Sequence, residues 1–430
     1  MKTIDVKGGR LLCVHTDKFK TELLTVTQSA PFERRDMGLC TLLCNVLKRG
    51  CRAYPSTADI NRRLDDLYDA NITMGSSTNG DSFLSGMTVE TLCRDFIHDG
   101  ADVLSDAIDV VAQMMTAPLT DENGLFRSEY VEGEKQARLD RFRSSNSNPR
   151  ARSSLICQEL MFEGERYGQR LFYSEDEIKS VTNQDLADYH KKMLSISSPL
   201  YIYVGPRSED EIGALVSEKL SFFDGKAAPV SETLVKGCTG ELKTGFDSMA
   251  VNQGKLTVGL RSDVAIGDDS VYAAIVFNDI FGGSPASKLF RNVREKLSLC
   301  YSCGSYYDFT KGVIFVRSGI ANENYERALG EILHQLDDIK KGNISEFEFE
   351  SAKKALVSGY RQVTDSAYAT ESFFRTRILC GCTDGIEETA QKIESVTLSD
   401  VVEVAQRFGA QAVGFVRGEL EGEEVDFDEE

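Results

Sequence analysis

The chain has 430 residues and a formal net charge of −19. Its length favours two or more domains, and its acidic balance argues against a nucleic-acid partner because phosphate backbones are also negative. No stretch approaches the ~20 apolar residues of a membrane span, and the first residues lack the apolar core of a secretory signal, so a cytoplasmic protein without a membrane partner is expected.

The predicted elements of the first half begin with a strand followed by two helices. A hairpin comes next, with Asn79 and Gly80 as its turn. Four helices follow, and a strand closes the half. The expected segments are a strand at 20–30, helices through 70, a hairpin at 71–92, helices at 102–117, 128–145, 150–164 and 183–195, and a strand at 199–205.

The second half repeats this order. Its expected segments are a strand at 254–264, helices through 297, a hairpin at 299–321, helices at 324–341, 345–363 and 369–379, and a strand at 412–418. Strands grouped in hairpins beside segregated helices indicate an α+β fold with mostly antiparallel sheets.

Two helix starts mark the repeat. Thr182 with Asp185 and Thr397 with Asp400 both form capping-type starts, and the two threonines are 215 positions apart, half the chain length. The segment between residues 225 and 240 is interrupted by Gly, Pro and Lys, which places the boundary there. We therefore expect homologous domains at 1–228 and 235–420, followed by a solvated acidic tail at 421–430.

The helix predicted around residues 38–50 is the most informative segment. An apolar stripe predicts one buried face. Asp36 is the expected N-cap, and Gly50 is expected at the left-handed position after the last turn. A second face holds Thr41, Cys44 and Asn45, which are spaced at i, i+3 and i+4. The stripe comprises Leu39, Leu42, Leu43, Val46 and Leu47.

This helix resembles the zinc helix of the M16 metallopeptidases, the pitrilysin and mitochondrial processing peptidase group. That family carries HxxEH, with two histidines on zinc and a glutamate as general base. With Gly38 and Gly50 matched to the family frame, the histidines fall on Thr41 and Asn45, and the glutamate falls on Cys44. The resemblance implies two domains of the LuxS/MPP-like metallohydrolase type with a degenerate zinc site.

The remaining zinc ligand of the family is a glutamate on a later helix. Glu134 resembles that helix's supporting carboxylate, and the ligand seven residues on falls on Arg141, although a shifted register could offer Glu132. A lone carboxylate would not hold catalytic zinc. No two histidines are close enough to share a helix turn. We therefore expect no metal, no cofactor and no catalytic residue in this chain alone. The histidines are His15, His98, His190 and His334.

The second half keeps a pair that the family uses on substrate. After Gly282 and Gly283, Arg294 and Tyr301 stand seven residues apart. In the family such a guanidinium and phenol contact the peptide, and both can donate hydrogen bonds to an oxyanion. Alternatively, Arg294 forms a surface ion pair and Tyr301 packs on the sheet.

The chain resembles more narrowly the zinc-less members of the elongation factor P 5-aminopentanol modification-associated proteins. The matching stretches are residues 19–31, 62–72 and 289–302. The resemblance implies a half-size, non-catalytic subunit that pairs with an HxxEH-bearing partner, or with itself. The pair would enclose a peptide and lend Arg294 and Tyr301 to zinc held by the partner. A scaffold without peptide processing is the alternative, followed by a free-standing peptidase with an unusual metal site.

Eleven cysteines, an odd number at low density, indicate reduced thiols rather than a disulfide framework. Cys300 and Cys303 are three apart on a predicted strand, so they are expected on opposite faces. That placement disfavours a joint metal or redox role. Cys380 and Cys382 lie at a predicted helix end, without a second cysteine pair nearby to complete a zinc set.

Overall fold

The computed structural model describes residues 3–223, 225, 233–298 and 300–419, so the predicted tail at 421–430 lies outside the described residues. The chain forms two compact units, and each takes a segment from the opposite half of the sequence. These units are defined by contacts, whereas the predicted ranges 1–228 and 235–420 mark homologous halves and stay a prediction. Unit 1 comprises Met1–Arg141, Arg170–Glu232 and Val363–Asp384, and unit 2 comprises Phe142–Gln169, Thr233–Gln362 and Gly385–Glu430.

The sheet of unit 1 has six strands in the order β1-β2-β6-β3-β5-β4. Every neighbouring pair is antiparallel except β2 with β6. The hairpin predicted at 71–92 is confirmed, and Gly80 takes a positive φ of 55° at its turn. The strands are β1 (Ile4–Val6), β2 (Gly9–His15), β3 (Thr21–Pro31), β4 (Asn71–Asn79), β5 (Ser82–Leu92) and β6 (Leu200–Gly205).

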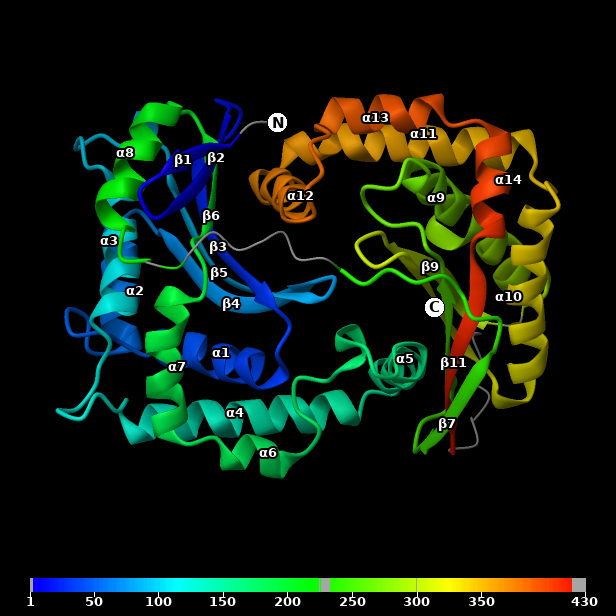
Figure 1. Ribbon diagram of the computed structural model, residues 1–430, viewed down its shortest axis with the longest axis horizontal. Coiled ribbons are helices and arrows are strands. Elements are labelled where there is room, and N and C mark those ends of the chain that lie inside the picture. The colour runs from blue at the N-terminus through cyan, green and yellow to red at the C-terminus, as the bar shows by residue number, and fades with distance from the viewer. Residues whose placement is uncertain (1–2, 224, 226–232, 299, 420–430) are drawn as a thin grey trace, which may run out of the picture. The chain divides into compact units, whose positions relative to one another are not determined.

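Helices cover this sheet, and one of them comes from the second half of the sequence. That helix, α12 (Ala367–Leu379), packs on β6 and β3 (Figure 1). Its Glu371 accepts a hydrogen bond from the Thr25 hydroxyl of β3 at 3.0 Å. The other helices are α1 (Arg34–Leu47), α2 (Thr57–Asp66), α3 (Val103–Thr116), α4 (Ser128–Asn146), α6 (Glu175–Ser180), α7 (Asn183–Ser195) and α8 (Glu209–Lys219); the last residues of α4 belong to unit 2.

A buried ion network closes the end of β6. Arg207 is 1% exposed, and its guanidinium donates to Glu22, which is fully buried, from Nε and Nη2 at 2.8 Å each. The same Nη2 donates to Asp102 at 2.7 Å. Since Glu22 lies on β3 and Asp102 is the N-cap of α3, the network ties three elements together.

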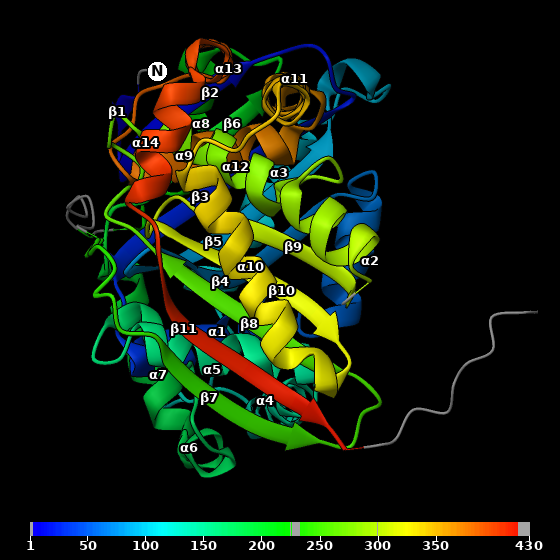
Figure 2. The same cartoon turned by 90° about the vertical axis from the view of Figure 1, so that its right-hand side faces the viewer.

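The sheet of unit 2 has five strands in the order β7-β11-β8-β10-β9. Strand β7 pairs in parallel with β11, and the other neighbouring pairs are antiparallel. Strands β2 to β6 of unit 1 have the same arrangement, so the two sheets repeat one topology. Figure 2 shows the five strands side by side with α10 in front. They are β7 (Lys243–Met249), β8 (Gly254–Arg261), β9 (Cys300–Asp308), β10 (Val313–Ile320) and β11 (Gly409–Gly418).

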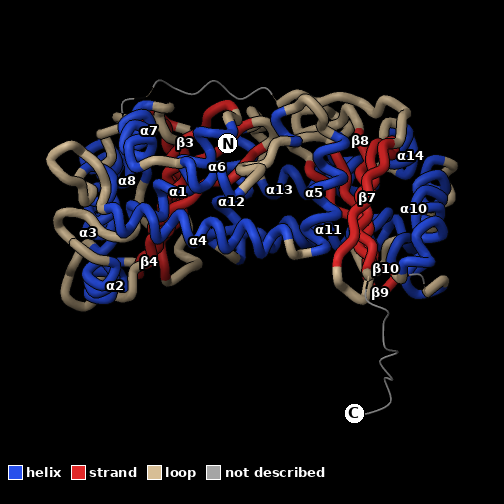
Figure 3. Tube along the Cα trace, turned by 90° about the horizontal axis from the view of Figure 1, so that it is seen from below, coloured by secondary structure: helices blue, strands red, loops and turns tan. Residues whose placement is uncertain are grey.

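The largest core of unit 2 lies between one sheet face and helices such as α10, while α5 packs against the other face (Figure 3). Two glycines allow α5 to approach closely. A Cβ at Gly414 would lie 2.2 Å from the Ser153 carbonyl oxygen, and one at Gly259 would lie 2.8 Å from the Met161 sulfur. The helices are α5 (Pro149–Met161), α9 (Val271–Asn278), α10 (Tyr325–Lys340), α11 (Glu346–Gln362), α13 (Ile386–Ser395) and α14 (Leu398–Gln406).

The predicted α+β class is confirmed, with two mostly antiparallel sheets packed with helices. Both predicted capping boxes are also present, at Thr182 with Asp185 and at Thr397 with Asp400. None of the helices in the described part of the chain is long and apolar enough to span a membrane.

Candidate functional site

Helix α1 has the predicted apolar stripe but not the predicted ends. Its N-cap is Glu33, and Asp36 lies in the first turn, where its carboxylate accepts from Lys192 Nζ at 2.6 Å instead of capping. The helix ends with Lys48 as C-cap, so Gly50 is not the first residue past the helix. A glycine is required at position 50 for close packing instead, because a Cβ there would lie 2.7 Å from the Pro55 carbonyl oxygen.

The three residues of the second face are engaged with their own surroundings. The Thr41 hydroxyl donates to the Met37 carbonyl at 2.8 Å and lies 2.7 Å from Ser76 Oγ. Cys44 is 2% exposed, and its sulfur lies 4.0 Å from that of Cys40. The hydrogen bond with Cys40, followed by burial, raises the pKa of the Cys44 thiol above 9.0, so this thiol stays protonated.

Helix α4 supplies a carboxylate near this face, but a guanidinium holds it. Glu134 is buried and accepts from Arg49 Nε at 2.6 Å. Arg141 is exposed on the same helix. Glu132 is also exposed and forms an ion pair with Lys135 at 3.2 Å. The position predicted to hold the third ligand is therefore cationic, and the buried carboxylate of α4 forms an ion pair with Arg49.

In unit 2, the predicted substrate-contact residues lie in an irregular segment. Residues Asp279–Gly283 and Leu289–Lys296 are π-helical, a conformation often found at functional sites. Arg294 is exposed, and its guanidinium lies 4.4 Å from the centre of the Phe290 ring. Tyr301 belongs to β9, and its side chain lies outside the described residues. A substrate role for Arg294 and Tyr301 stays a prediction.

The expected placement of Cys300 and Cys303 on opposite faces is wrong. Cys303 pairs with Ser318 and Ser302 with Gly319, but Cys300 pairs with Ile320, so Tyr301 has no partner on β10. The extra residue makes a β-bulge, which rephases the side-chain alternation of the strand. Both cysteines consequently face the same core.

A buried acid lies in the first π-helical segment. Asp279 is 8% exposed, and its Oδ2 has no hydrogen-bond partner among the described residues. Burial raises the pKa of the Asp279 carboxyl to about 6, although a hydrogen bond with Ser284 opposes the rise. Gly282 packs beside it, where a Cβ would lie 2.8 Å from the Ser305 backbone nitrogen. Gly282 therefore serves close packing against β9, whereas a Cβ at Gly283 would approach Asp279 of its own segment.

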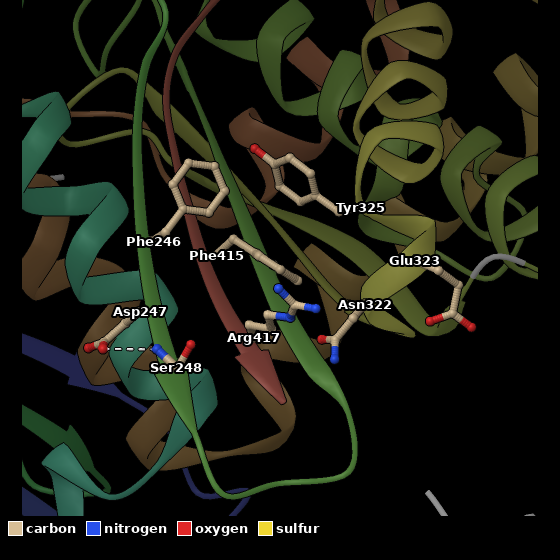
Figure 4. Close-up of a pocket in the computed structure, with 8 residues that line it drawn as sticks. All are labelled: Phe246, Asp247, Ser248, Asn322, Glu323, Tyr325, Phe415 and Arg417. Atoms are coloured by element: carbon tan, nitrogen blue, oxygen red, sulfur yellow. Dashed lines mark hydrogen bonds between the residues drawn. The ribbon is translucent and has the colours of Figure 1, made fainter. Parts of the chain in front are cut away.

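A pocket of about 890 Å³ opens at the edge of the unit 2 sheet (Figure 4). The Tyr325 and Phe415 ring centres lie 4.7 Å apart, and that of Phe246 lies 5.5 Å from Tyr325. Phe246 is 62% exposed, and in Figure 4 Arg417 lies beside Phe415. The lining combines three aromatic rings with one guanidinium, Arg417, and two carboxylates, Asp247 and Glu323, so its charge does not select an anionic ligand. The lining residues are Phe246, Asp247, Ser248, Asn322, Glu323, Tyr325, Phe415 and Arg417.

Known proteins resemble this chain over nearly its whole length. A family model described as Peptidase M16 inactive domain matches residues 180–356. "Probable inactive metalloprotease YmfF" of Bacillus subtilis (strain 168) is 27% identical over 406 residues, which cover 94% of this chain and 95% of that protein. The crystal structure of a conserved protein from Enterococcus faecalis V583 matches with a TM-score of 0.89 and 28% identity, covering 98% of this chain and 99% of that one. The chain is thus similar to M16-type peptidases, through the inactive-domain model over residues 180–356 and through a relative named as a probable inactive metalloprotease.

A more distant structure supports the fold alone. The peptidase M16 inactive domain from Pseudomonas fluorescens matches with a TM-score of 0.78 at 16% identity, covering 98% of this chain and 99% of that one. The fold class predicted from the resemblance is thus confirmed.

The residues at the M16 zinc position do not fit zinc. Catalytic Zn²⁺ takes three protein ligands from His, Glu, Asp or Cys. The resemblance predicts that these positions hold Thr41, Asn45 and Arg141, namely a hydroxyl, an amide and a cation, or Glu132 in place of Arg141 in a shifted register. Within the described ranges, no cluster of three or more metal-ligating side chains occurs. No hydrolytic step through zinc follows from this donor set.

Two features of the structure were not predicted from the sequence. The buried Asp279 gives no local signal, because its surroundings come from a π-helical turn. The aromatic pocket combines residues from β7, β11 and the start of α10, which are far apart in sequence. Only the alternation around Phe246, in KTGFDSM, could have indicated an edge strand with one exposed ring.

Proposed function

We propose that this chain is a non-catalytic M16-type subunit that does not hydrolyse peptides alone. It would pair with an HxxEH-bearing M16 partner in the cytoplasm and enclose a peptide between the two chains. The observation that carries the proposal is the donor set at the zinc position, where Thr41, Asn45 and Arg141 replace ligands. The similarity to the Bacillus subtilis relative, which is named a probable inactive metalloprotease, supports the proposal.

Arg294 and Tyr301 would be this chain's contribution to the shared site. Arg294 makes no ion pair with another described residue and stacks on Phe290, so its N–H groups remain available to a peptide carbonyl. A guanidinium and a phenol can stabilise the oxyanion that forms when hydroxide attacks that carbonyl. The zinc and the general base would belong to the partner, because a metal helix and oxyanion donors can lie on facing walls.

The first experiment uses the purified chain alone. We expect less than stoichiometric zinc by elemental analysis and no cleavage of a fluorogenic peptide library, with or without added Zn²⁺. Stoichiometric, tightly held zinc would overturn the proposal. So would cleavage that a chelator abolishes and Zn²⁺ restores.

The second experiment mixes the chain with an HxxEH-bearing M16 subunit from the same genome. We expect turnover only in the mixture, and we expect Arg294→Ala or Tyr301→Phe each to lower kcat about 10²–10³-fold, the usual effect of removing an oxyanion donor. Matched controls come from the same elements. Arg291→Ala removes another exposed arginine of the second π-helical segment, and Tyr306→Phe removes an exposed phenol of β9.

The controls decide between the composite site and a scaffold. Losses confined to Arg294 and Tyr301 support shared catalysis. Equal turnover in all four variants would remove the composite site, and complex formation without turnover would favour the scaffold role. A self-associated chain, detected by sedimentation before mixing, would instead support pairing with itself.

A further inference from the structure

Two thiols share one face of β9 because of the bulge at Tyr301. Cys303 pairs with Ser318 and Cys300 with Ile320, and these two partners are alternate residues of the regular strand β10. Alternate residues of a strand point to the same side. Cys300 and Cys303 belong to the same buried core cluster, at 8% and 7% exposure, which supports this placement independently.

The spacing allows a covalent bond between the sulfurs only if the bulged strand shifts locally. Partners of alternate residues lie about 6.6 Å apart along the strand, twice the rise per residue. Natural disulfides join residues with Cα atoms about 4.4–6.8 Å apart. A disulfide also needs Cβ atoms about 3.5–4.5 Å apart, which is closer than parallel side chains of alternate residues stand. Bridging therefore requires the backbone at Cys300 to move by about 2 Å, and a bulged edge strand can make this movement because Tyr301 has no ladder partner to lose.

The surroundings favour a reactive thiolate at Cys300. The hydrogen bond with Cys303 lowers the pKa of the Cys300 thiol to about 7, against the opposing effect of burial, and the positive charge of Arg294 acts in the same direction. Arg294 is exposed, so the approach to this end of β9 carries a cation. Reactive cysteines occupy electropositive positions with some access to solvent, and Cys300 is 8% exposed, compared with 0% for Cys40 and 2% for Cys44.

We propose that Cys300 and Cys303 form a reversible disulfide when the protein meets hydrogen peroxide. The Cys300 thiolate attacks one peroxide oxygen, forming an S–O bond and breaking the O–O bond. The released hydroxide takes a proton and leaves as water. Cys303 sulfur then attacks the sulfenic sulfur of Cys300, and hydroxide leaves with the Cys303 proton as a second water. Two thiols are oxidised by two electrons, one peroxide is reduced, and a dithiol reductant restores both thiols.

A second thiol pair provides an internal contrast. Cys40 and Cys44 are also adjacent, with sulfurs 4.0 Å apart, but they are 0% and 2% exposed within α1. The hydrogen bond with Cys44 lowers the pKa of the Cys40 thiol, as Cys303 does for Cys300, so the two pairs differ in exposure. Because Cys40 is fully buried, this pair is expected to remain reduced under conditions that oxidise Cys300. Comparing the two pairs therefore tests whether exposure of the thiolate, in addition to closeness of the two thiols, is needed for oxidation.

The test treats the full chain with hydrogen peroxide at pH 7 and maps its thiols by mass spectrometry after alkylation. We expect a Cys300–Cys303 disulfide that dithiothreitol reverses, with Cys40 and Cys44 still alkylated. Cys303→Ser should abolish the disulfide and leave a sulfenic acid on Cys300 that dimedone traps. As the control, Cys380→Ser combined with Cys382→Ser removes the more exposed pair and should leave the disulfide unchanged.

The pH profile gives a readout that does not need a variant to fold. Between pH 6 and 8 the oxidation rate of wild-type Cys300 should rise only ~10-fold and level off, as expected for a thiol titrating near 7, whereas an ordinary thiol would gain ~100-fold. Three results would overturn the proposal: reduced Cys300 and Cys303 beside other oxidised thiols, sulfinic acid on Cys300 without a disulfide, or an unlevelled ~100-fold rise.

Discussion

Returning the general base to α1 tests whether the space around Cys44 still accepts a charge. The substitution is Cys44→Glu, at a site that is 2% exposed. The usual pKa of a glutamate is ~4.3, so keeping the carboxyl neutral at pH 7 spans ~2.7 pH units. At ~1.36 kcal/mol per unit, this lowers the free energy of unfolding by about 4 kcal/mol. The additional side-chain atoms add about 1–3 kcal/mol through overpacking.

Cys44→Gln separates the two effects because it has the same shape and no charge. Urea unfolding at pH 7 and pH 4 measures both variants. The buried carboxyl has a folded-state pKa above its unfolded value. Its contribution to the protein's stability is therefore fully present below pH ~4.3 and is lost as the pH rises. We expect the Glu variant to be about 4 kcal/mol less stable than the Gln variant at pH 7 and nearly equal to it at pH 4. Equal stability at both pH values would show that the site accepts a carboxylate, and our reading of a closed site would be wrong.

Three further predictions concern stability. Asp279→Asn should raise the free energy of unfolding at pH 8 by on the order of 3 kcal/mol and have little effect at pH 3.5. The reason is that burial raises the pKa of this carboxyl from 3.8 to about 6, so the stability that it contributes at low pH is lost as the pH rises. A gain that is independent of pH would contradict this cause. Arg207→Met should lower the free energy of unfolding in urea by about 3–5 kcal/mol, because it leaves Glu22 buried and unpaired. Adding Glu22→Gln should recover part of the loss. No recovery would argue that the ion pair is not the cause. Gly282→Ala should cost about 1–3 kcal/mol, because its Cβ would lie 2.8 Å from the Ser305 backbone nitrogen. Gly283→Ala should cost less, because no atom would lie closer than 3.0 Å to its Cβ. The reverse order would exclude close packing as the reason for Gly282.

The features that the sequence predicted correctly depend on neighbouring residues. The hairpin at 71–92 follows from alternation on either side of an Asn-Gly turn. The capping boxes at Thr182 and Thr397 need only a hydroxyl and a carboxylate three residues apart. The buried stripe of α1 follows from helical periodicity. Leu39, Leu42, Leu43, Val46 and Leu47 are all at most 6% exposed.

The features that could not be predicted depend on tertiary contacts. The bulge at Tyr301 appears only in the pairing of β9 with β10, so alternation counted along the sequence put Cys303 on the wrong face. The cap predicted at Asp36 is wrong because α1 begins earlier, with Glu33 as N-cap, and Asp36 lies in the first turn with its carboxylate bound by Lys192, 156 positions away. The assignment of α12 to unit 1 depends on its packing against β3 and β6. No local pattern encodes such long-range contacts.

The fold of α1 does not depend on the residues at its predicted ligand positions. The packing free energy of α1 comes from its apolar stripe, whereas the ligand positions lie on another face, where Thr41 satisfies its hydroxyl with Met37 and Ser76. Glu134 remains buried without a metal because Arg49 neutralises it. Replacing ligands therefore removes the chemistry of the helix while leaving its packing in place. For this reason a TM-score of 0.89 cannot establish a peptidase, and the donor atoms at three positions must decide the question.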